Sequence, residues 1–224
     1  MKLSLIIPAL NEKEFIKKTL KEIVKVPGIE VIVSDGGSTD STREISARAA
    51  RVVKSRPGRG VQMNAGASVA SGDILLFLHA DTLLPENWED KLLLAMSDER
   101  VVGGAFTLSI DSARLSHKII ASAANIRSRV TGIHYGDQGI FVKRSVFEKI
   151  GGFKDIPIME DVDLMRRLKK VGIVVMLKDK VLTSARRWDK EGAVYATIRN
   201  WLLITLYYMG VAPERLYKFY KIIR

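Results

Sequence analysis

The chain has 224 residues, of which 47% are hydrophobic and 27% are charged, a balance that is typical of a globular domain and excludes a disordered or fibrous protein. It contains no cysteine, which excludes a disulfide framework and a thiolate metal site. The formal net charge of +11 favours a polyanionic partner, which is a nucleic acid, an anionic membrane surface or a phosphorylated small molecule.

Nucleic acid is the weakest of these partners, and we expect no nucleic acid to bind. Basic residues are scattered along the chain, only 7% of the residues are aromatic, and the sequence has no RNA- or DNA-binding signature. The apolar stretch within residues 1–8 is too short for a signal peptide, and no apolar run reaches the roughly 18 residues of a membrane-spanning helix. These features predict a cytoplasmic protein and leave open peripheral attachment to the inner face of the cell membrane.

In the first hundred residues, strand-like and helix-like segments alternate and are joined by short links. Pro8 is expected to end the first strand, Asn11 to cap the first helix, and Asp40 or Ser41 to cap the second. This alternation predicts an α/β fold with a Rossmann-like, doubly wound and mostly parallel sheet. The expected strands are residues 3–7, 31–33, 52–53 and 72–78, and the expected helices are residues 12–25, a helix through Ile45 and Ala49, residues 61–70, and a helix that begins at Pro85-Glu86.

The second half of the sequence is less regular. A bulge is expected at Gly103-Gly104, and no linker-like change in composition divides the chain. We therefore expect one domain over residues 1–190, followed by C-terminal helices over residues 191–224 that pack on the domain or lie on a membrane surface. The expected strands are residues 101–110, 139–142, 173–176 and 181–184, and the expected helices are residues 112–130, 144–150, 160–171, 192–209 and 213–223.

An apolar run over residues 72–78 ends abruptly in His79-Ala80-Asp81. A short run of this kind suits a strand that is buried on both faces, and ligands of open α/β sheets bind beyond the carboxyl ends of such strands. A carboxylate at that edge can hold a divalent metal, and the metal can hold a diphosphate. The alternative is that Asp81 only opens the next turn.

Two other polar segments follow predicted strands or turns. In Asp35-Gly36-Gly37, the carboxylate can accept hydrogen bonds from a base or a ribose, and the glycines let a flat ligand approach the backbone. The alternative is an Asp-Gly turn that precedes a good helix cap. The segment from Arg56 to Asn64 holds two arginines beside a Gly-rich turn and a helix start, which makes an anion site or a solvated basic loop.

Asp161 shares the expected buried stripe of its helix with Leu164, Met165 and Leu168, at spacings of three, four and seven residues. A carboxylate on an inward stripe is explained by a general base or by a helix cap. Asp163 falls on another face, together with charged neighbours, and is expected to be solvated.

These segments occur in an order that resembles glycosyltransferase family 2, whose members are inverting enzymes of GT-A fold. The resemblance covers roughly residues 1–190, and its strength lies in the agreement of several weak motifs in order and in strand-end placement. The segments that carry it are Pro8-Ala9-Leu10-Asn11-Glu12, Asp35-Gly36-Gly37-Ser38-Thr39-Asp40, Arg59 with Gln62 and Asn64-Ala65-Gly66, His79-Ala80-Asp81, and Glu160-Asp161.

The resemblance implies a role for each matching position. Asp161 matches the catalytic base, Asp35 the base-binding aspartate, and Asp81 the last aspartate of the Asp-X-Asp motif, which would hold Mn²⁺ or Mg²⁺. His79 departs from the family because the first aspartate of that motif usually stands there. Its alternatives are a metal ligand, a nucleotide contact and a packed strand-end histidine, of which we favour the last two. The remaining expected nucleotide or donor contacts are Pro8, Asn11, Glu12, Gly37, Arg59, Asn64 and Ala80.

Contacts to the acceptor or to the donor sugar are expected from two further segments. Asp137 and Gln138 lie in a polar stretch that approaches the sugar in the family, with a plain polar turn as the alternative. Glu160, Arg187 and Trp188 complete this set. Arg187-Trp188 is half of the motif Gln-x-x-Arg-Trp of processive members, and Ser184 stands in place of its glutamine, so processive synthesis is not expected.

The resemblance implies an inverting, metal-dependent transferase that moves a sugar from a nucleotide-diphosphate sugar, with UDP as the favoured nucleotide, to an acceptor hydroxyl. One alternative is a sugar-1-phosphate nucleotidyltransferase, but Pro8–Glu12 stand where that class has a Gly-rich loop with Arg and Lys. Another is a non-catalytic module that binds anionic membranes. The stripe Leu216, Phe219, Tyr220 and Ile223 predicts a basic amphipathic helix at a membrane interface or a core helix, and the first case favours a lipid or other apolar alcohol as acceptor.

Overall fold

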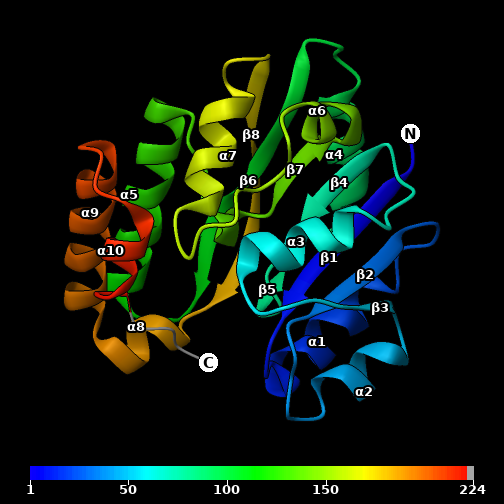
Figure 1. Cartoon of the computed structure of the whole chain (residues 1–224), viewed down its shortest axis with the longest axis horizontal. Coiled ribbons are helices and arrows are strands. Elements are labelled where there is room, and N and C mark those ends of the chain that lie inside the picture. Colours follow the sequence, from blue (N-terminus) through cyan, green and yellow to red (C-terminus); the bar gives the residue numbers. More distant parts are fainter. Residues whose placement is uncertain (221–224) are drawn as a thin grey trace.

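The computed structural model describes residues 1–220. One eight-stranded sheet runs through the described chain in the order β3-β2-β1-β4-β7-β6-β8-β5, and helices cover both of its faces (Figure 1). The first four strands are parallel, as predicted for the first hundred residues. The strands are β1 (Leu3–Ala9), β2 (Glu30–Asp35), β3 (Arg51–Lys54), β4 (Ile74–Phe77), β5 (Thr82–Leu83), β6 (Val101–Asp111), β7 (Ile140–Lys143) and β8 (Ile173–Ser184).

The second half of the chain inserts its strands on one side of β4. Strand β7 is antiparallel to both β4 and β6, whereas β8 is parallel to β6 and antiparallel to β5. The helices are α1 (Lys13–Ile23), α2 (Thr42–Ala47), α3 (Arg59–Ala67), α4 (Trp88–Met96), α5 (Leu115–Thr131), α6 (Arg144–Lys149), α7 (Glu160–Leu168), α8 (Arg186–Glu191), α9 (Ala193–Tyr208) and α10 (Pro213–Tyr217), with the 3₁₀ turn η1 at Gly136–Gln138.

Two apolar cores lie on opposite faces of the sheet, and strand periodicity divides the residues of β1 between them. Leu5 and Ile7 face the core that also contains α1 and α4, whereas Ile6 faces the core that contains α3 and α7. All three side chains are fully buried. A strand buried on both faces reads as a continuous apolar run, which is why β1 and β4 were visible in the sequence.

Pro8 does not end the first strand, contrary to the prediction. Strand β1 continues to Ala9 and pairs with β2 up to Asp35, but its ladder with β4 ends at Ile6 and Phe77. Proline lacks an N–H, so it is tolerated where a neighbouring ladder has already stopped. The longer strand carries residues 8 and 9 out to the edge of the sheet where β4 also ends.

Asn11 does not cap the first helix. The N-cap position belongs to Glu12, without a side-chain cap bond, and Asn11 has a left-handed backbone with φ of 57°. The Asn11 Oδ1 atom instead accepts a hydrogen bond from the Thr39 N–H at 2.9 Å. Asn11 therefore joins the β1–α1 turn to the β2–α2 turn. At the second helix the N-cap position belongs to Ser41, without a side-chain cap bond, and the Asp40 carboxylate before it accepts the Thr42 N–H at 2.9 Å.

The region after residue 172 differs most from the prediction. The two strands expected there are one strand, β8, because its pairing with β6 continues from Val101 to Asp111 across two irregularities. One of these irregularities lies at Gly103, where a bulge was expected.

Three further elements differ from the prediction. The short strand β5 and the helix α8 were not predicted, and the helix expected to begin at Pro85-Glu86 begins at Trp88. Strand β5 has two residues, too few for a periodic pattern to be recognised in the sequence.

The C-terminal helices pack on the domain through a small apolar cluster. Leu216 of α10 is buried with Leu203 of α9 and Ile158 from the loop before α7. The stripe predicted for residues 213–223 is therefore split, because Leu216 faces inward, Phe219 is exposed, and Ile223 lies outside the described residues. Within residues 1–220, no helix is both long and apolar enough to cross a bilayer.

Gly66 of α3 tests how closely this helix must approach the sheet. A Cβ atom at Gly66 would overlap Ile6 Cγ2 and lie 3.0 Å from Ser34 Oγ. Alanine gains about 1 kcal/mol of helix propensity over glycine, but overpacking a core costs roughly 1–3 kcal/mol. We expect Gly66→Ala to lower the free energy of unfolding in urea denaturation.

Ala65→Gly, which lies next to it on α3, is the control and should lose about 1 kcal/mol through propensity alone. A Gly66→Ala protein more stable than the wild type would show that the helix does not need this close approach.

Candidate active site

The carboxyl ends of β1 and β4 face a cavity of about 530 Å³, a volume in the roughly 300–1,000 Å³ range of small-ligand sites. The loops before α3, η1 and α7 form further walls, and the β8–α8 junction and parts of α9 and α10 complete the lining. Ten residues predicted from the sequence line this cavity: Pro8, Glu12, Arg59, His79, Ala80, Asp81, Asp137, Asp161, Arg187 and Trp188.

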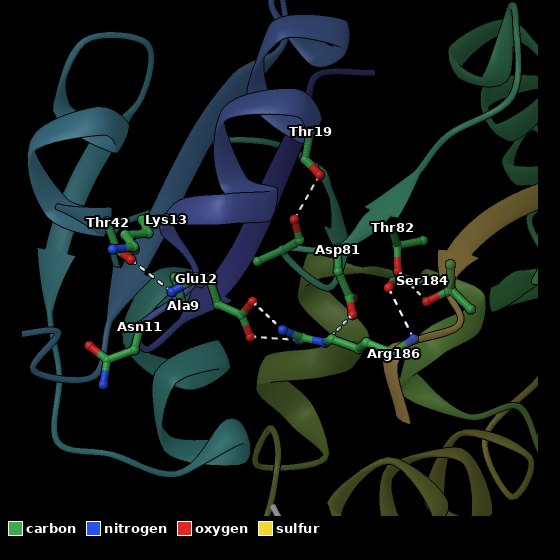
Figure 2. A network of polar contacts seen from close by, with 12 residues as sticks. Ala9, Asn11, Glu12, Lys13, Thr19, Thr42, Asp81, Thr82, Ser184 and Arg186 are labelled. Atoms are coloured by element: carbon green, nitrogen blue, oxygen red, sulfur yellow. Dashed lines mark hydrogen bonds and ion pairs between the residues drawn. The ribbon is translucent and has the colours of Figure 1, made fainter. Parts of the chain in front are cut away.

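At the end of β4, Asp81 is held by an arginine that comes from the other end of the chain. Arg186 Nε lies 2.9 Å from Asp81 Oδ2, and its two terminal nitrogens each lie 2.7 Å from a carboxylate oxygen of Glu12 (Figure 2). The three side chains are largely buried, with 18% of Arg186, 10% of Asp81 and 11% of Glu12 exposed. Asp81 therefore has a positive partner within the protein itself.

The pairing of β5 with β8 determines where Arg186 lies. Strand β5 pairs with β8 so that Thr82 lies opposite Thr183, and their hydroxyl oxygens are 3.0 Å apart in a buried contact. The Ser184 N–H donates to the Asp81 carbonyl at 3.2 Å, and α8 begins two residues later. Because α8 starts where this ladder stops, its first side chain is directed to the end of β4.

Asp161 lies at the first turn of α7, after a strained residue. Met159 occupies the N-cap position with φ of 66°, a left-handed conformation that is uncommon outside glycine, asparagine and aspartate. Asp161 Oδ2 accepts the Gly136 N–H and Oδ1 accepts the Val162 N–H, both at 2.7 Å. The half-buried Asp161 thus keeps one fixed orientation at the cavity wall, where Gly136 is needed because a Cβ would lie 2.8 Å from His79 Nε2.

Asp163 was expected to be solvated, but it is buried. Its carboxylate pairs with Lys154 Nζ at 2.8 Å and with Arg167 Nε at 2.7 Å. Arg167 also donates to the Ile150 and Gly152 carbonyls, each at 2.7 Å. Helix periodicity cannot show that the loop before α7 folds back over this face, so Asp163 has a structural role that the sequence did not reveal.

Burial and the local charges shift several pKa values in the cavity. Burial, aided by Arg59, Arg186 and Arg187, lowers the pKa of His79 to about 3, so this imidazole is neutral at physiological pH. Burial also raises the pKa of Asp137 to about 6, although Arg127 opposes the shift. Asp137 Oδ1 is buried without a hydrogen-bond partner among the described residues. A buried acceptor of this kind is suited to a hydroxyl group of a ligand.

The donor atoms near Asp81 do not fit a divalent cation in this arrangement. Mg²⁺ and Mn²⁺ favour several oxygen ligands. Here Asp81 is already engaged by Arg186, and the place of a second carboxylate is taken by His79. Among residues 1–220, no group of three or more His, Cys, Asp and Glu side chains is arranged to hold a metal ion. No step of the reaction considered below depends on a metal.

Six of the predicted site residues do not line this cavity. Asp35 and Gly37 border a separate hollow beside α2, and the Asp35 carboxylate accepts the Ser38 N–H at 3.2 Å, which is the turn geometry that the sequence left open. Asn11 lies in the turn described above. The other three are Asn64, Gln138 and Glu160.

Asn64 and Gln138 hold the scaffold of the site together. Asn64 exchanges two hydrogen bonds with the Phe153 backbone, at 2.8 and 2.9 Å, and so joins α3 to the loop before α7. Gln138 is fully buried; its Oε1 accepts from Ser128 Oγ and the Tyr135 N–H, and its Nε2 donates to the Phe106 carbonyl. These bonds give both side chains a structural role, and their predicted contacts with a ligand stay predictions.

The structure also adds residues that the sequence reasoning did not assign to the site. Gln62 lines the cavity and donates to the carbonyls of Ala9 and Ser34, at 2.8 and 2.9 Å, which ties α3 to β1 and β2. Tyr217 and Tyr220 reach the cavity from the C-terminal segment. Gln62 belongs to the segment with Arg59 and Asn64 that carries the family resemblance, so the sequence could have indicated its place in the site. Nothing in the local sequence of residues 217–220 indicates that they reach the cavity.

The model of the family described as "Glycosyl transferase family 2" matches residues 4–151, which is more than half of the chain. The chain belongs to glycosyltransferase family 2. The match spans β1 to α6 and includes the segments on which the resemblance was based, except Glu160-Asp161, which lies beyond it.

Similar curated proteins agree with this assignment. The probable glycosyltransferase YdaM of Bacillus subtilis is 26% identical over 85% of this chain and 51% of its own length, so the chain spans about half of that relative. Glucosyl-3-phosphoglycerate synthase of Mycobacterium tuberculosis is 39% identical, over 37% of this chain and 30% of the relative.

Solved structures of two other proteins show the same fold. TarS of S. aureus superposes with a TM-score of 0.64 at 16% identity, covering 89% of this chain and 38% of TarS. Glucosyl-3-phosphoglycerate synthase from Mycobacterium tuberculosis, in complex with Mn²⁺, UDP and glucosyl-3-phosphoglycerate, gives a TM-score of 0.62 at 21% identity and covers 90% of this chain and 78% of that one. The GT-A fold predicted from the sequence is thereby confirmed.

Glu160 tests the electrostatics beside Asp161. Burial, with the Asp161 charge, raises the pKa of Glu160 above its ordinary value of 4.5, and Arg59 at 3.9 Å offsets this only in part. Between the two pKa values the folded state retains a proton that the unfolded state has released, so stability falls as pH rises through this window. Glu160→Gln removes the ionisable group and therefore this pH-dependent loss of stability.

The free energy of unfolding of Glu160→Gln relative to the wild type should therefore rise from pH 5 to pH 7, by at most about 1.4 kcal/mol per pH unit. Urea denaturation at each pH measures it, and Glu86→Gln, at an exposed glutamate, is the control. Parallel pH profiles for Glu160→Gln and the wild type would contradict the raised pKa.

Proposed function

We propose that the protein is an inverting glycosyltransferase that moves a sugar from a UDP-sugar to an acceptor hydroxyl. The observation that carries the proposal is Asp161, a carboxylate fixed by two backbone N–H groups at the wall of a cavity that also contains arginines. Family membership supports the reaction class, and solved neighbours contain UDP-N-acetylglucosamine, in TarS, and UDP-glucose, in glucosyl-3-phosphoglycerate synthase.

In the proposed reaction, Asp161 removes the proton from the acceptor hydroxyl. The acceptor oxygen forms a bond to the anomeric carbon as the bond from that carbon to the diphosphate breaks, and the leaving UDP takes the electron pair. One displacement from the opposite face inverts the configuration. Each Asp161 oxygen accepts one backbone N–H and keeps a second lone pair, so the carboxylate can be oriented and still accept a proton.

Positive charge for the leaving diphosphate would come from Arg59, Arg186 and Arg187, which we call the arginine cluster. All three line the cavity, and all three lower the pKa of His79, which lines it too. Guanidinium groups suit phosphates because their planar donors bind oxygen pairs. Asp137, whose Oδ1 lacks a partner, is proposed to accept a hydroxyl of the donor sugar or acceptor, and Asp35 to contact the nucleoside from its separate hollow.

Asp161→Asn should reduce turnover by roughly 10²–10⁴-fold, the usual contribution of a general base, and leave UDP affinity nearly unchanged. UDP release from UDP-glucose and UDP-N-acetylglucosamine measures turnover, and calorimetry measures the affinity. Asp90→Asn makes the same chemical change at an exposed site on α4 and should behave as the wild type. Near-normal turnover in Asp161→Asn would refute the base, and release of pyrophosphate from a sugar phosphate and UTP would indicate a nucleotidyltransferase instead.

We also propose that an anionic membrane surface is a partner, through helices α5 and α9. Figure 1 shows these helices at one side of the molecule, with α9 at the edge. Neither helix contains an acidic residue, whereas α5 carries the exposed Lys118 and Arg129. This face, called the apolar face below, is formed by Leu115, Ile119, Ile126 and Val130 of α5 and by Val194, Tyr195, Ile198, Trp201, Leu202, Tyr208 and Met209, all exposed.

The chemistry of the apolar face favours lipid. Tryptophan and tyrosine are enriched where an apolar region meets water, and lysine and arginine favour anionic headgroups. Asn200 of α9 lines the cavity while Trp201 and Leu202, which follow it, are exposed. A lipid-linked or other apolar alcohol held at this face would therefore have a short route to Asp161, which supports an apolar acceptor.

The wild type should co-sediment with phosphatidylglycerol vesicles, less with phosphatidylcholine, and less at high salt. Leu202→Glu, at a residue 56% exposed on the apolar face, should abolish this binding, whereas Leu94→Glu, at a residue 76% exposed on α4, should not. Equal recovery in the supernatant with and without vesicles at low salt would exclude the membrane. A dimer that Leu202→Glu dissociates would show that a second copy covers the face.

A further inference from the structure

The contact between Arg186 and Asp81 bears on how the diphosphate is held, and the inference drawn from it rests on the proposed transferase function. Arg186 Nε lies 2.9 Å from Asp81 Oδ2 in a largely buried ion pair. A divalent cation bound through that oxygen would have to displace the guanidinium. Two further bonds of 2.7 Å hold the same guanidinium on Glu12, and its central carbon lies 4.7 Å from the Phe15 ring centre.

These contacts fix the guanidinium without using all its donors. Arginine has five N–H donors; the two hydrogen bonds to Glu12 use one on each terminal nitrogen, and the Nε group forms an ion pair with Asp81. Two N–H groups remain on a side chain that lines the cavity. The plane of the guanidinium is set by the two-oxygen contact with Glu12, so the remaining donors have a fixed direction before any ligand binds.

The residues at the end of β4 favour an arginine side chain, rather than a metal ion, as the positive group beside Asp81. His79 stands where the family usually has the first aspartate of its metal motif, so Asp81 is the one carboxylate of this segment. The single carboxylate of Asp81 would be a weak site for a hard divalent cation, because such a cation favours several oxygen ligands. The same Asp81 is a good counter-ion for an arginine, because a carboxylate and a guanidinium are complementary in charge and geometry, and Glu12 is a second carboxylate on this guanidinium.

We propose that the Arg186 guanidinium takes the place of the divalent cation at the end of β4, where it binds the diphosphate together with Arg59 and Arg187. Asp81 and Glu12 are then positioning residues for Arg186 rather than ligands of a metal. Binding of UDP and turnover of the donor do not require a divalent ion, because the charge that the ion would supply is already built into the chain.

UDP binding by calorimetry is the first test, on the whole protein after dialysis against EDTA. Added Mn²⁺ should change the UDP affinity of the wild type by less than about threefold, and Arg186→Gln should weaken it by about tenfold or more through the loss of a charged phosphate contact. Arg100→Gln is the matched control, because Arg100 makes an exposed contact with Asp98 at 2.8 Å, away from the cavity, and its UDP affinity should be unchanged.

Double-variant behaviour separates a positioning residue from a metal ligand. If Asp81 acts only through Arg186, Asp81→Asn should weaken UDP binding less than Arg186→Gln, and the double variant should be no weaker than Arg186→Gln alone. Thermal unfolding of each variant shows whether it is folded. Additive losses in the double variant, or Mn²⁺ that tightens UDP binding at least tenfold in the wild type but not in Asp81→Asn, would overturn the inference.

Donor turnover in EDTA keeps this inference distinct from the proposed function. Release of UDP from UDP-glucose or UDP-N-acetylglucosamine at equal rates with EDTA and with Mn²⁺ supports both. Release only with Mn²⁺ would leave the transferase function intact and overturn the role of Arg186. No release under either condition would count against the function, and Arg186 would then be judged on UDP binding alone.

Discussion

The three-residue contact of Glu12, Arg186 and Asp81 joins the two halves of the molecule. Glu12 follows β1, Asp81 follows β4, and Arg186 comes from the β8–α8 junction, 174 residues after Glu12. Breaking one partner of a largely buried ion pair typically costs about 3–5 kcal/mol, because the remaining charge is left uncompensated. This contact therefore fixes the position of α8 against the sheet edge, and with it the part of the cavity wall that α8 supplies.

A second constraint comes from polar side chains that connect loops to the frame. Gln62 connects α3 to β1 and β2, Asn64 connects α3 to Phe153, and Gln138 connects η1 to β6 and α5. Each replaces main-chain hydrogen bonds that the loops cannot make for themselves. Buried amide groups thus fix the backbone of several loops that form the cavity walls.

The sequence predicted the first half of the fold well because β1, β2 and β4 are apolar runs and the helices between them have a clear periodicity. It also placed Asp81 and Asp161 at the ends of elements, where both line the cavity. Short or long-range features escaped prediction. Strand β5 is too short for periodicity, the burial of Asp163 depends on a loop that folds back, and the partner of Asp81 lies more than a hundred residues away. None of these three features is indicated by the sequence immediately around it.

Strand β8 has a consequence for the order in which the molecule is assembled. It lies between β6 and β5, so β5, which follows β4 directly in the sequence, has no strand partner until residues 182 and 183 reach it. Contacts between distant residues close long loops and form slowly. During synthesis, the parallel strands β1 to β4 can pair while the end of β4 is still open. The cavity is then completed in a late step of folding, when the chain up to α8 docks on an existing sheet.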